Sequence, residues 1–322
     1  MADNAVVFPA SGEKERRLLG FGSRTLAGYE WPYCAISGAM DGPTLGLIAG
    51  VHGAEYPPID AVMQFCRALD PATLRGRIVA VPVVNLPAFW ERTPFVCPND
   101  GKNPNRVFPG DSNGTFSEAL AYHLFEAVIR RGHYLIDLHC GDMVEDLMPF
   151  SLMQELGNAE VDGRARALAV AFGLPYVVVQ PHGGGPVAGT TNGAAAQAGI
   201  PAMIAEAGGV GQLDPKAVEL HLRGLHHALL HLGMLKGEPE GLQPPTMIGD
   251  FVWVRAQRGG YFHKALVAGD AVMAGHSLGR MHDLWGTPQN EILSPVDGVA
   301  LFVTTSPAIS DDGLIAGIGV PA

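Results

Sequence analysis

Short apolar segments typical of buried strands alternate with segments of helical periodicity between residues 44 and 235. The expected strands are residues 44–50, 76–84, 134–138, 176–180 and 201–205, and the expected helices are residues 59–69, 120–131, 165–172 and 215–235. This alternation predicts an α/β fold with a largely parallel or mixed sheet. Ligand sites in such sheets lie at the carboxyl ends of the strands, so polar residues directly after a strand are the first functional candidates.

The character of the sequence changes near Lys236. Residues 236–246 contain three prolines and no periodicity, which is typical of a linker. Short β-like segments separated by turn signals follow at residues 250–255, 265–267 and 298–303. The length of 322 residues also exceeds the usual size of one domain. We therefore expect an α/β domain over residues 1–236 and a small all-β domain over residues 247–322.

Charge and apolar content exclude several classes of partner. The formal net charge is -11, and an acidic chain repels the phosphates of nucleic acid. No run of about 18 apolar residues exists, so we expect no membrane span. Residues 1–17 are polar and lack the apolar core of a signal peptide. The four cysteines form no C-x-x-C pair, which favours reduced thiols and a cytoplasmic protein.

His52, Glu55 and His139 are candidate metal ligands. His52 and Glu55 follow the first expected strand, three residues apart in the segment HGAE, and His139 directly follows the strand at 134–138. Positions three apart at the start of a helix share a face. Catalytic zinc takes three such protein ligands and leaves one position for water. The alternative is that His52 and Glu55 cap the next helix or pair with each other.

Glu206 is the candidate general base. It follows the apolar strand at 201–205, where a buried carboxylate is costly without a task or a partner. A zinc hydrolase needs a group that takes a proton from water and passes it to the leaving amine. The alternative is a carboxylate that pairs with an arginine or caps the next element.

A polar loop carries the candidate substrate-binding residues. Asn105 and Arg106 stand side by side in the segment DGKNPNRVFPG, and Arg92 lies upstream of it. The planar guanidinium fits a carboxylate with two hydrogen bonds, and an amide adds a neutral donor. A cation at Arg92 is suited to hold the oxyanion of a scissile carbonyl. The alternative for either arginine is a solvated loop residue.

Three other features resemble metal, phosphate or catalytic sites, but each has a simpler interpretation. Residues 181–186 resemble a phosphate-binding loop but lack its Lys-Ser/Thr ending, so we expect an active-site loop or a simple turn. Four histidines recur along the expected helix at 215–235, where a polar face is the simpler interpretation. Strand alternation past His139 would turn Cys140 to the opposite face, which favours a packing role.

These segments occur in the order HGAE, NPNRVFPG, DLHCGD and an apolar strand ended by a glutamate. That order, over residues 40–212, resembles the succinylglutamate desuccinylase/aspartoacylase family of the zinc-carboxypeptidase fold, and the nearest branch is the bacterial N-acetyl-diaminobutyrate deacetylases. The family fold is a mixed sheet flanked by helices, with a small β domain shading the active site. The resemblance implies one zinc ion held by His52, Glu55 and His139, catalysis by Glu206, carboxylate recognition by Asn105 and Arg106, and a contact of Arg92 with the scissile carbonyl.

The resemblance implies a zinc-dependent deacylase that cleaves the amide of an N-acyl amino acid or a similar small amide. Pro104 stands where the family commonly carries leucine, and proline should stiffen the loop. Tyr261, in the β domain, is a candidate substrate contact. The expected partner is this small substrate, with homo-oligomerisation left open. The alternatives are a carboxypeptidase, a metal-dependent binding protein without catalysis, and a cysteine hydrolase that uses Cys140.

Overall fold

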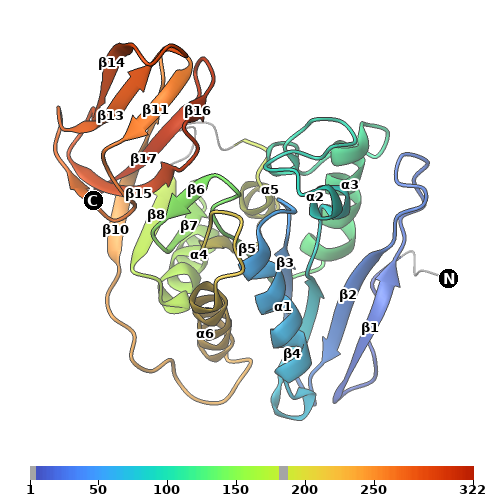
Figure 1. The fold of residues 1–322 in the computed structure, drawn as a ribbon. Helices are drawn as coiled ribbons and strands as arrows, with labels where there is room; N and C mark the ends of the chain where they lie inside the picture. The colour runs from blue at the N-terminus through green and yellow to red at the C-terminus, as the bar shows by residue number, and fades with distance from the viewer. Residues whose placement is uncertain (1–4, 181–187) are drawn as a thin grey trace.

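A computed structural model describes residues 5–180 and 188–322. The expected loop at 181–186 lies outside the described residues. The structure is a mixed α/β fold built on one large sheet, with a second, antiparallel sheet near the C-terminus (Figure 1). This confirms the expected fold class.

The large sheet has 13 strands. In spatial order they are β1 (Glu13–Leu19), β2 (Trp31–Ser37), β4 (Arg75–Val81), β3 (Met40–Ala49), β5 (Tyr134–His139), β9 (Ala202–Glu206), β7 (Phe150–Gln154), β8 (Tyr176–Gln180), β10 (Thr246–Arg255), β17 (Leu314–Pro321), β15 (Gly298–Thr304) and β12 (Ala271–Val272), with β6 (Glu145–Leu147) paired to β15. The four-stranded sheet has the order β14 (Pro288–Leu293), β13 (Ser277–His282), β11 (Gly260–Lys264) and β16 (Ala308–Ile309).

The helices are α1 (Tyr56–Ala68), α2 (Leu86–Glu91), α3 (Phe116–Leu124), α4 (Ala159–Phe172), α5 (Thr191–Gln197) and α6 (Pro215–His231), with short turns η1 (Pro71–Thr73), η2 (Pro104–Arg106) and η3 (Phe125–Ile129). Helix α6 packs between α1 and α4, so these three helices lie side by side along the sheet (Figure 1). Their apolar faces and the central strands bury the main core. No helix among the described residues is long and apolar enough to cross a membrane.

Strands β3, β5 and β9 run parallel and adjacent, and their register brings their carboxyl ends to one edge of the sheet. Parallel strands buried on both faces are continuously apolar, which is why the sequence identifies them clearly. The central strands lie close to the ranges expected from the sequence, and β8 matches its range in full.

Several expectations about elements were wrong. No strand covers residues 265–267 in the described structure, because β11 ends at Lys264. The last helix ends at His231 rather than residue 235. The C-terminal segment is also not confined to a separate sheet: β10 pairs in parallel with β8, so the large sheet continues into it. The division into domains at residues 236 and 247 therefore stays a prediction, although the C-terminal strands do bury an apolar cluster of their own.

Candidate active site

The loop between β3 and α1 positions His52 and Glu55. Helix α1 begins at Tyr56 and has prolines in its first turn, where the missing amide hydrogen costs nothing. Gly53 has no alternative, because a Cβ there would lie 2.2 Å from the backbone nitrogen of Phe89 in α2. Glu55 occupies the N-cap position, but within the described chain its side chain makes no capping hydrogen bond. Capping of α1 is therefore not its role.

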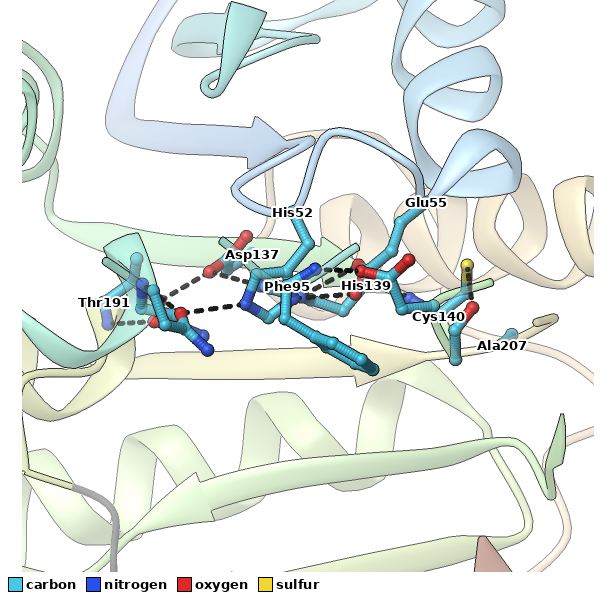
Figure 2. Close-up of polar contacts among 12 residues, drawn as sticks. His52, Glu55, Phe95, Asp137, His139, Cys140, Thr191 and Ala207 are labelled. Carbon is cyan, nitrogen blue, oxygen red and sulfur yellow. Dashed lines mark hydrogen bonds and ion pairs between the residues drawn. The ribbon is translucent and has the colours of Figure 1, made fainter. Parts of the chain in front are cut away.

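His52, Glu55 and His139 converge on one point (Figure 2). Nδ1 of His52 lies 2.8 Å from Oε1 of Glu55, and Nδ1 of His139 lies 3.0 Å from Oε2 of the same carboxylate. One ligand atom from each residue falls within 4.8 Å of the other two. The carboxylate of Glu55 and the imidazole of His139 are almost fully buried. His52 and Glu55 do pair, as the alternative interpretation expected, but they pair around a third candidate ligand.

A second polar side chain contacts each imidazole at its Nε2 atom, on the side away from Glu55. Nε2 of His52 lies 3.0 Å from Oδ1 of Asn103, an oxygen that also accepts the backbone N–H of Asn105. Nε2 of His139 lies 3.0 Å from Oδ2 of Asp137, which also accepts the hydroxyl of Thr191 (Figure 2). Each imidazole therefore has an acceptor at both nitrogens, the Nε2 atom facing Asn103 or Asp137 and the Nδ1 atom facing Glu55.

Two imidazole nitrogens that face one carboxylate need a proton or a metal cation between them and its oxygens. This arrangement shifts the pKa values of His139 and Glu55. Burial lowers the pKa of His139, but Asp137 and Glu55 outweigh it and hold that pKa well above its usual value. Burial raises the pKa of Glu55, but His139 and His52 outweigh it and hold that pKa below its usual range. The donor set, two imidazoles and one carboxylate with oriented outer partners, fits a zinc ion.

Glu206 ends β9 and lies directly opposite His139 in the register of β5 and β9. Burial raises the pKa of the Glu206 carboxyl well above its usual value, and the charges of Glu55 and Glu145 add to this effect. The charge of His139 acts in the other direction and is outweighed. A carboxyl group with a raised pKa, next to the candidate ligands, is suited to hold and transfer a proton.

A cavity of about 610 Å³ opens over this group of residues. Asn105 and Arg106 line it, in the turn η2 that Asn103 caps and Pro104 begins. Pro104 therefore occupies the position that proline favours in such a turn, and it leaves both neighbours in the site. The Asn105 side chain is buried and accepts the backbone N–H of Thr191, while Arg106 donates through Nη1 to the Asn105 carbonyl.

The C-terminal strands line the other side of the cavity. They contribute aromatic and polar side chains that include Phe251, Trp253, Arg255, Phe302 and Thr304. Arg255 is already engaged, since it donates to the Asp312 carbonyl and lies 3.7 Å from its carboxylate. The small β domain expected over residues 247–322 therefore supplies part of the enclosure of the candidate site.

Arg92 and Tyr261 are not brought to this cavity. Among the described residues that line it, neither is present. Arg92 is exposed and ends α2 in the left-handed region, with a φ of 56°. Tyr261 lies in β11 with 46% of its surface exposed. Their proposed roles stay predictions from the family resemblance.

Sequence reasoning missed several residues of the site. Phe95 has a φ of 61°, donates its N–H to the buried Asp142, and sets its ring edge against His52, with centroids 6.3 Å apart. Glu145 lines the cavity from β6. Asp137 stands two residues before His139, so strand alternation was a usable signal for it. Nothing local in the sequence marks Phe95 or Glu145.

Cys140 and the helix histidines differ from expectation. Strand β5 ends at His139, so alternation no longer applies, and Cys140 lines the cavity. Burial and four neighbouring carboxylates raise the pKa of its thiol well above the usual value, which disfavours a nucleophilic thiolate. On α6, His221 and His227 are buried rather than part of a polar face. Among the described residues, only His52, Glu55 and His139 form a group that could hold a metal ion.

Comparisons with known proteins identify the family to which this chain is similar. The Succinylglutamate desuccinylase/Aspartoacylase catalytic domain matches residues 41–232. The chain is 31% identical over 267 residues to the N-alpha-acetyl-L-2,4-diaminobutyric acid deacetylase of Halomonas elongata, covering 80% of this chain and 77% of that protein.

Two solved structures share nearly the whole fold. A succinylglutamate desuccinylase/aspartoacylase from Rhodobacter sphaeroides has 26% identity and a TM-score of 0.86, over 99% of both chains. The product-bound ectoine utilization protein EutE (DoeB) from Ruegeria pomeroyi has 25% identity and a TM-score of 0.88, over 98% of this chain and 97% of that one.

Proposed function

Because the chain belongs to the succinylglutamate desuccinylase/aspartoacylase family, we propose that it is a zinc-dependent deacylase of N-acyl amino acids. Hydrolytic deacylation of acyl amides follows from the family and its named relatives. The identity of the metal, the substrate class and the roles of individual residues are the proposal. The observation that carries it is the convergence of His52, Glu55 and His139 within 4.8 Å at one end of the cavity.

His52, Glu55 and His139 would hold the zinc ion, the two histidines through Nδ1. A bound zinc supplies a Lewis acid that acidifies water and polarises the amide carbonyl. Asn103 and Asp137 fix the tautomer and the orientation of the two imidazoles through their Nε2 atoms. A metal would replace the contacts between the two Nδ1 atoms and Glu55, and the contacts at the two Nε2 atoms could stay as they are.

Glu206 is the proton carrier of the proposed reaction. Its carboxylate takes a proton from the attacking water and then delivers that proton to the nitrogen of the leaving amine. A raised pKa would let the carboxyl retain the proton until the carbon–nitrogen bond breaks, and the positive charge of a bound zinc ion would offset part of the rise, so that the carboxylate form could first take the proton. Its place opposite His139 keeps it beside the candidate ligands.

Asn105 and Arg106 would bind the carboxylate of the amino-acid half of the substrate. Arg106 offers the bidentate donor geometry that a carboxylate requires, and the Asn105 carbonyl holds the guanidinium in place. The C-terminal strands close one side of the cavity, which favours a small amide over a long peptide. The relative from Halomonas elongata is named for such a small amide. We assign no role in this scheme to Arg92 or Tyr261.

The test is a hydrolysis screen on N-acetyl and N-succinyl amino acids, joined to elemental analysis of the purified protein. We expect about one zinc per chain, loss of activity on chelation, and recovery when zinc is restored. Unchanged activity in the metal-free protein would contradict the zinc proposal. Faster cleavage of C-terminal residues from peptides than of N-acyl amino acids would favour the carboxypeptidase alternative, and metal binding without hydrolysis would favour the binding protein.

A further inference from the structure

Four aromatic side chains line one part of the cavity and have no task in the proposed reaction: Phe150 of β7, Phe251 and Trp253 of β10, and Phe302 of β15. The ring centroids of Phe150 and Phe251 lie 6.1 Å apart, and those of Phe251 and Trp253 lie 4.8 Å apart. Phe302 continues the series, with its centroid 5.6 Å from that of Trp253. We call these four residues the aromatic wall.

The aromatic wall packs on a glycine of the neighbouring strand. Gly317 of β17 lies opposite Trp253 on one side and opposite Phe302 on the other. A Cβ at this position would lie 2.5 Å from Cζ of Phe251 and 2.6 Å from Cδ1 of Phe302. A side chain on Gly317 would therefore displace both rings. The rings rest on the backbone of the sheet, which fixes their place in the cavity.

The aromatic wall begins beside the proposed proton carrier. Phe150 lies directly opposite Glu206 in the antiparallel register of β7 and β9, so both side chains face the same side of the sheet. The carboxylate-binding turn η2 reaches the site through other residues, since Asn103 caps it and contacts His52. In the sheet, the order β3, β5, β9, β7, β8 and β10 places the strand before His52 and the strands of the wall on opposite sides of Glu206.

Part of the aromatic wall is accessible to a ligand. Phe150 and Phe302 are buried, whereas Phe251 and Trp253 are only half-buried. Leu147, which pairs with Phe302, adds aliphatic surface to the same lining. The cavity of about 610 Å³ has room for a ligand much larger than an acetylated amino acid. Because removal of apolar surface from water is favourable, this part of the cavity favours an apolar group.

We propose that the aromatic wall is the acyl subsite and binds an apolar acyl group larger than acetyl. The inference rests on the proposed deacylase function and names its substrate class: N-acyl amino acids with an apolar acyl group such as hexanoyl or benzoyl. When Arg106 binds the substrate carboxylate, the acyl group is the half that extends past Glu206 toward Phe150. The wall binds this group by apolar contact and takes no part in bond cleavage.

The test compares N-acetyl-, N-hexanoyl- and N-benzoyl-L-alanine, which share the amine half and differ only in the acyl group. The zinc-loaded wild-type protein should prefer the two larger amides by about tenfold or more in kcat/KM, since each buried methylene contributes about a fourfold gain. Trp253→Ala should lower this preference by about tenfold, because it removes the largest ring of the wall. Trp253→Phe, which keeps an aromatic ring, should retain part of it.

Trp285→Ala is the matched control, because Trp285 is 93% exposed between β13 and β14 and is not among the described residues that line the cavity. It should leave the preference unchanged. N-acetyl-L-phenylalanine carries its apolar group on the amine half instead. If Trp253→Ala impairs cleavage of this amide but not of N-benzoyl-L-alanine, the wall receives the amino-acid side chain and the proposal is overturned. Equal kcat/KM for the three alanine amides in the wild-type protein would also overturn it.

Calorimetry separates this inference from the proposed function. If the wild-type protein hydrolyses none of these amides, the deacylase proposal fails on its own. Binding of the same uncleaved amides then still tests the aromatic wall. Tighter binding of the hexanoyl and benzoyl amides that is weakened in Trp253→Ala supports the assignment, and equal affinities for all three amides in the wild-type protein overturn it. The thermal unfolding midpoint of each variant verifies that it is folded.

Discussion

His139 and Glu206 lie directly opposite each other in the parallel register of β5 and β9. A candidate metal ligand and the candidate base are thus positioned by the backbone ladder of the sheet rather than by a flexible loop. A shift of one residue in this register would turn Glu206 to the other face. The relationship ties the proposed chemistry to the most buried part of the fold.

Glu206→Gln removes the proton carrier and preserves the shape of the side chain. We expect kcat to fall by about 100- to 10,000-fold, because the water and the leaving amine lose their proton relay. The metal content should stay at the wild-type level, since Glu206 is not a proposed ligand. Single-turnover kinetics and elemental analysis on the same sample measure both quantities. Activity close to that of the wild-type protein would remove Glu206 from the mechanism.

His52→Ala and His139→Ala each remove one of three proposed ligands. Zinc content should drop from about one per chain to a small fraction, because two protein ligands hold zinc poorly. His226→Ala, an exposed histidine on α6, is the control and should retain the metal. Full metal content in either ligand variant would mean that the ion, if bound, lies elsewhere.

Asp137→Asn tests the support behind His139. The carboxylate accepts from Nε2 of His139 and from the Thr191 hydroxyl, and both contacts are buried. An amide oxygen of the same shape keeps the fold but polarises the imidazole less. Zinc affinity should weaken by about 10- to 100-fold in a competition titration with a chelator. An unchanged dissociation constant would show that the pair has no influence on the metal.

His221 predicts how stability depends on pH. Burial lowers the pKa of this imidazole to about 4, despite the hydrogen bond with the Ala207 carbonyl. Between pH ~6.5 and ~4, the unfolded chain binds a proton at this site that the folded chain does not bind. The free energy of unfolding should therefore fall as the pH drops through this window, by on the order of 3 kcal/mol from this residue.

His221→Gln should flatten that dependence, while His226→Gln, at an exposed position on the same helix, should leave it unchanged. Denaturant titrations of the metal-free proteins at several pH values measure both slopes. The comparison needs metal-free protein, because protonation of the ligands would add its own pH dependence. Equal slopes for wild type and His221→Gln would contradict the assignment.

Cys140 should remain a neutral, unreactive thiol. Burial and the nearby charges of Glu55 and Glu206 oppose formation of the thiolate. Iodoacetamide at pH 8 should not modify this residue in the native protein, as mass spectrometry of digests would show, and activity should persist. Rapid alkylation of Cys140 with parallel loss of activity would instead support the cysteine-hydrolase alternative.

The sequence predicted the elements whose pattern is local. Buried parallel strands and the polar residues after them identified His52, Glu55, His139 and Glu206 as one group, and the parallel register of β3, β5 and β9 places them at one edge. Glu145 could not be found in this way. Its place in the cavity depends on pairing with Thr304, 159 positions later in the chain, and no local pattern encodes that contact.

Arg92 and the α6 histidines illustrate two other limits. Arg92 precedes the candidate substrate-binding loop in sequence, but a left-handed turn at the end of α2 decides where its side chain points. His221 and His227 were assigned to solvent by their polarity. The helical periodicity that His221 shares with buried Leu225 and Ala228, and His227 with buried Gly224, was the better guide, because packing of α6 between α1 and α4 determines exposure there.

The large sheet runs without interruption from the strands that carry the candidate ligands to the strands that close the cavity. The reacting groups come from residues before 210, whereas much of the enclosure comes from residues after 250. The residues for the reaction and the residues that enclose the substrate therefore come from separate parts of the chain, although one continuous sheet holds both. Evolution can alter the later stretch to admit a new side chain while the earlier stretch keeps the same hydrolytic step.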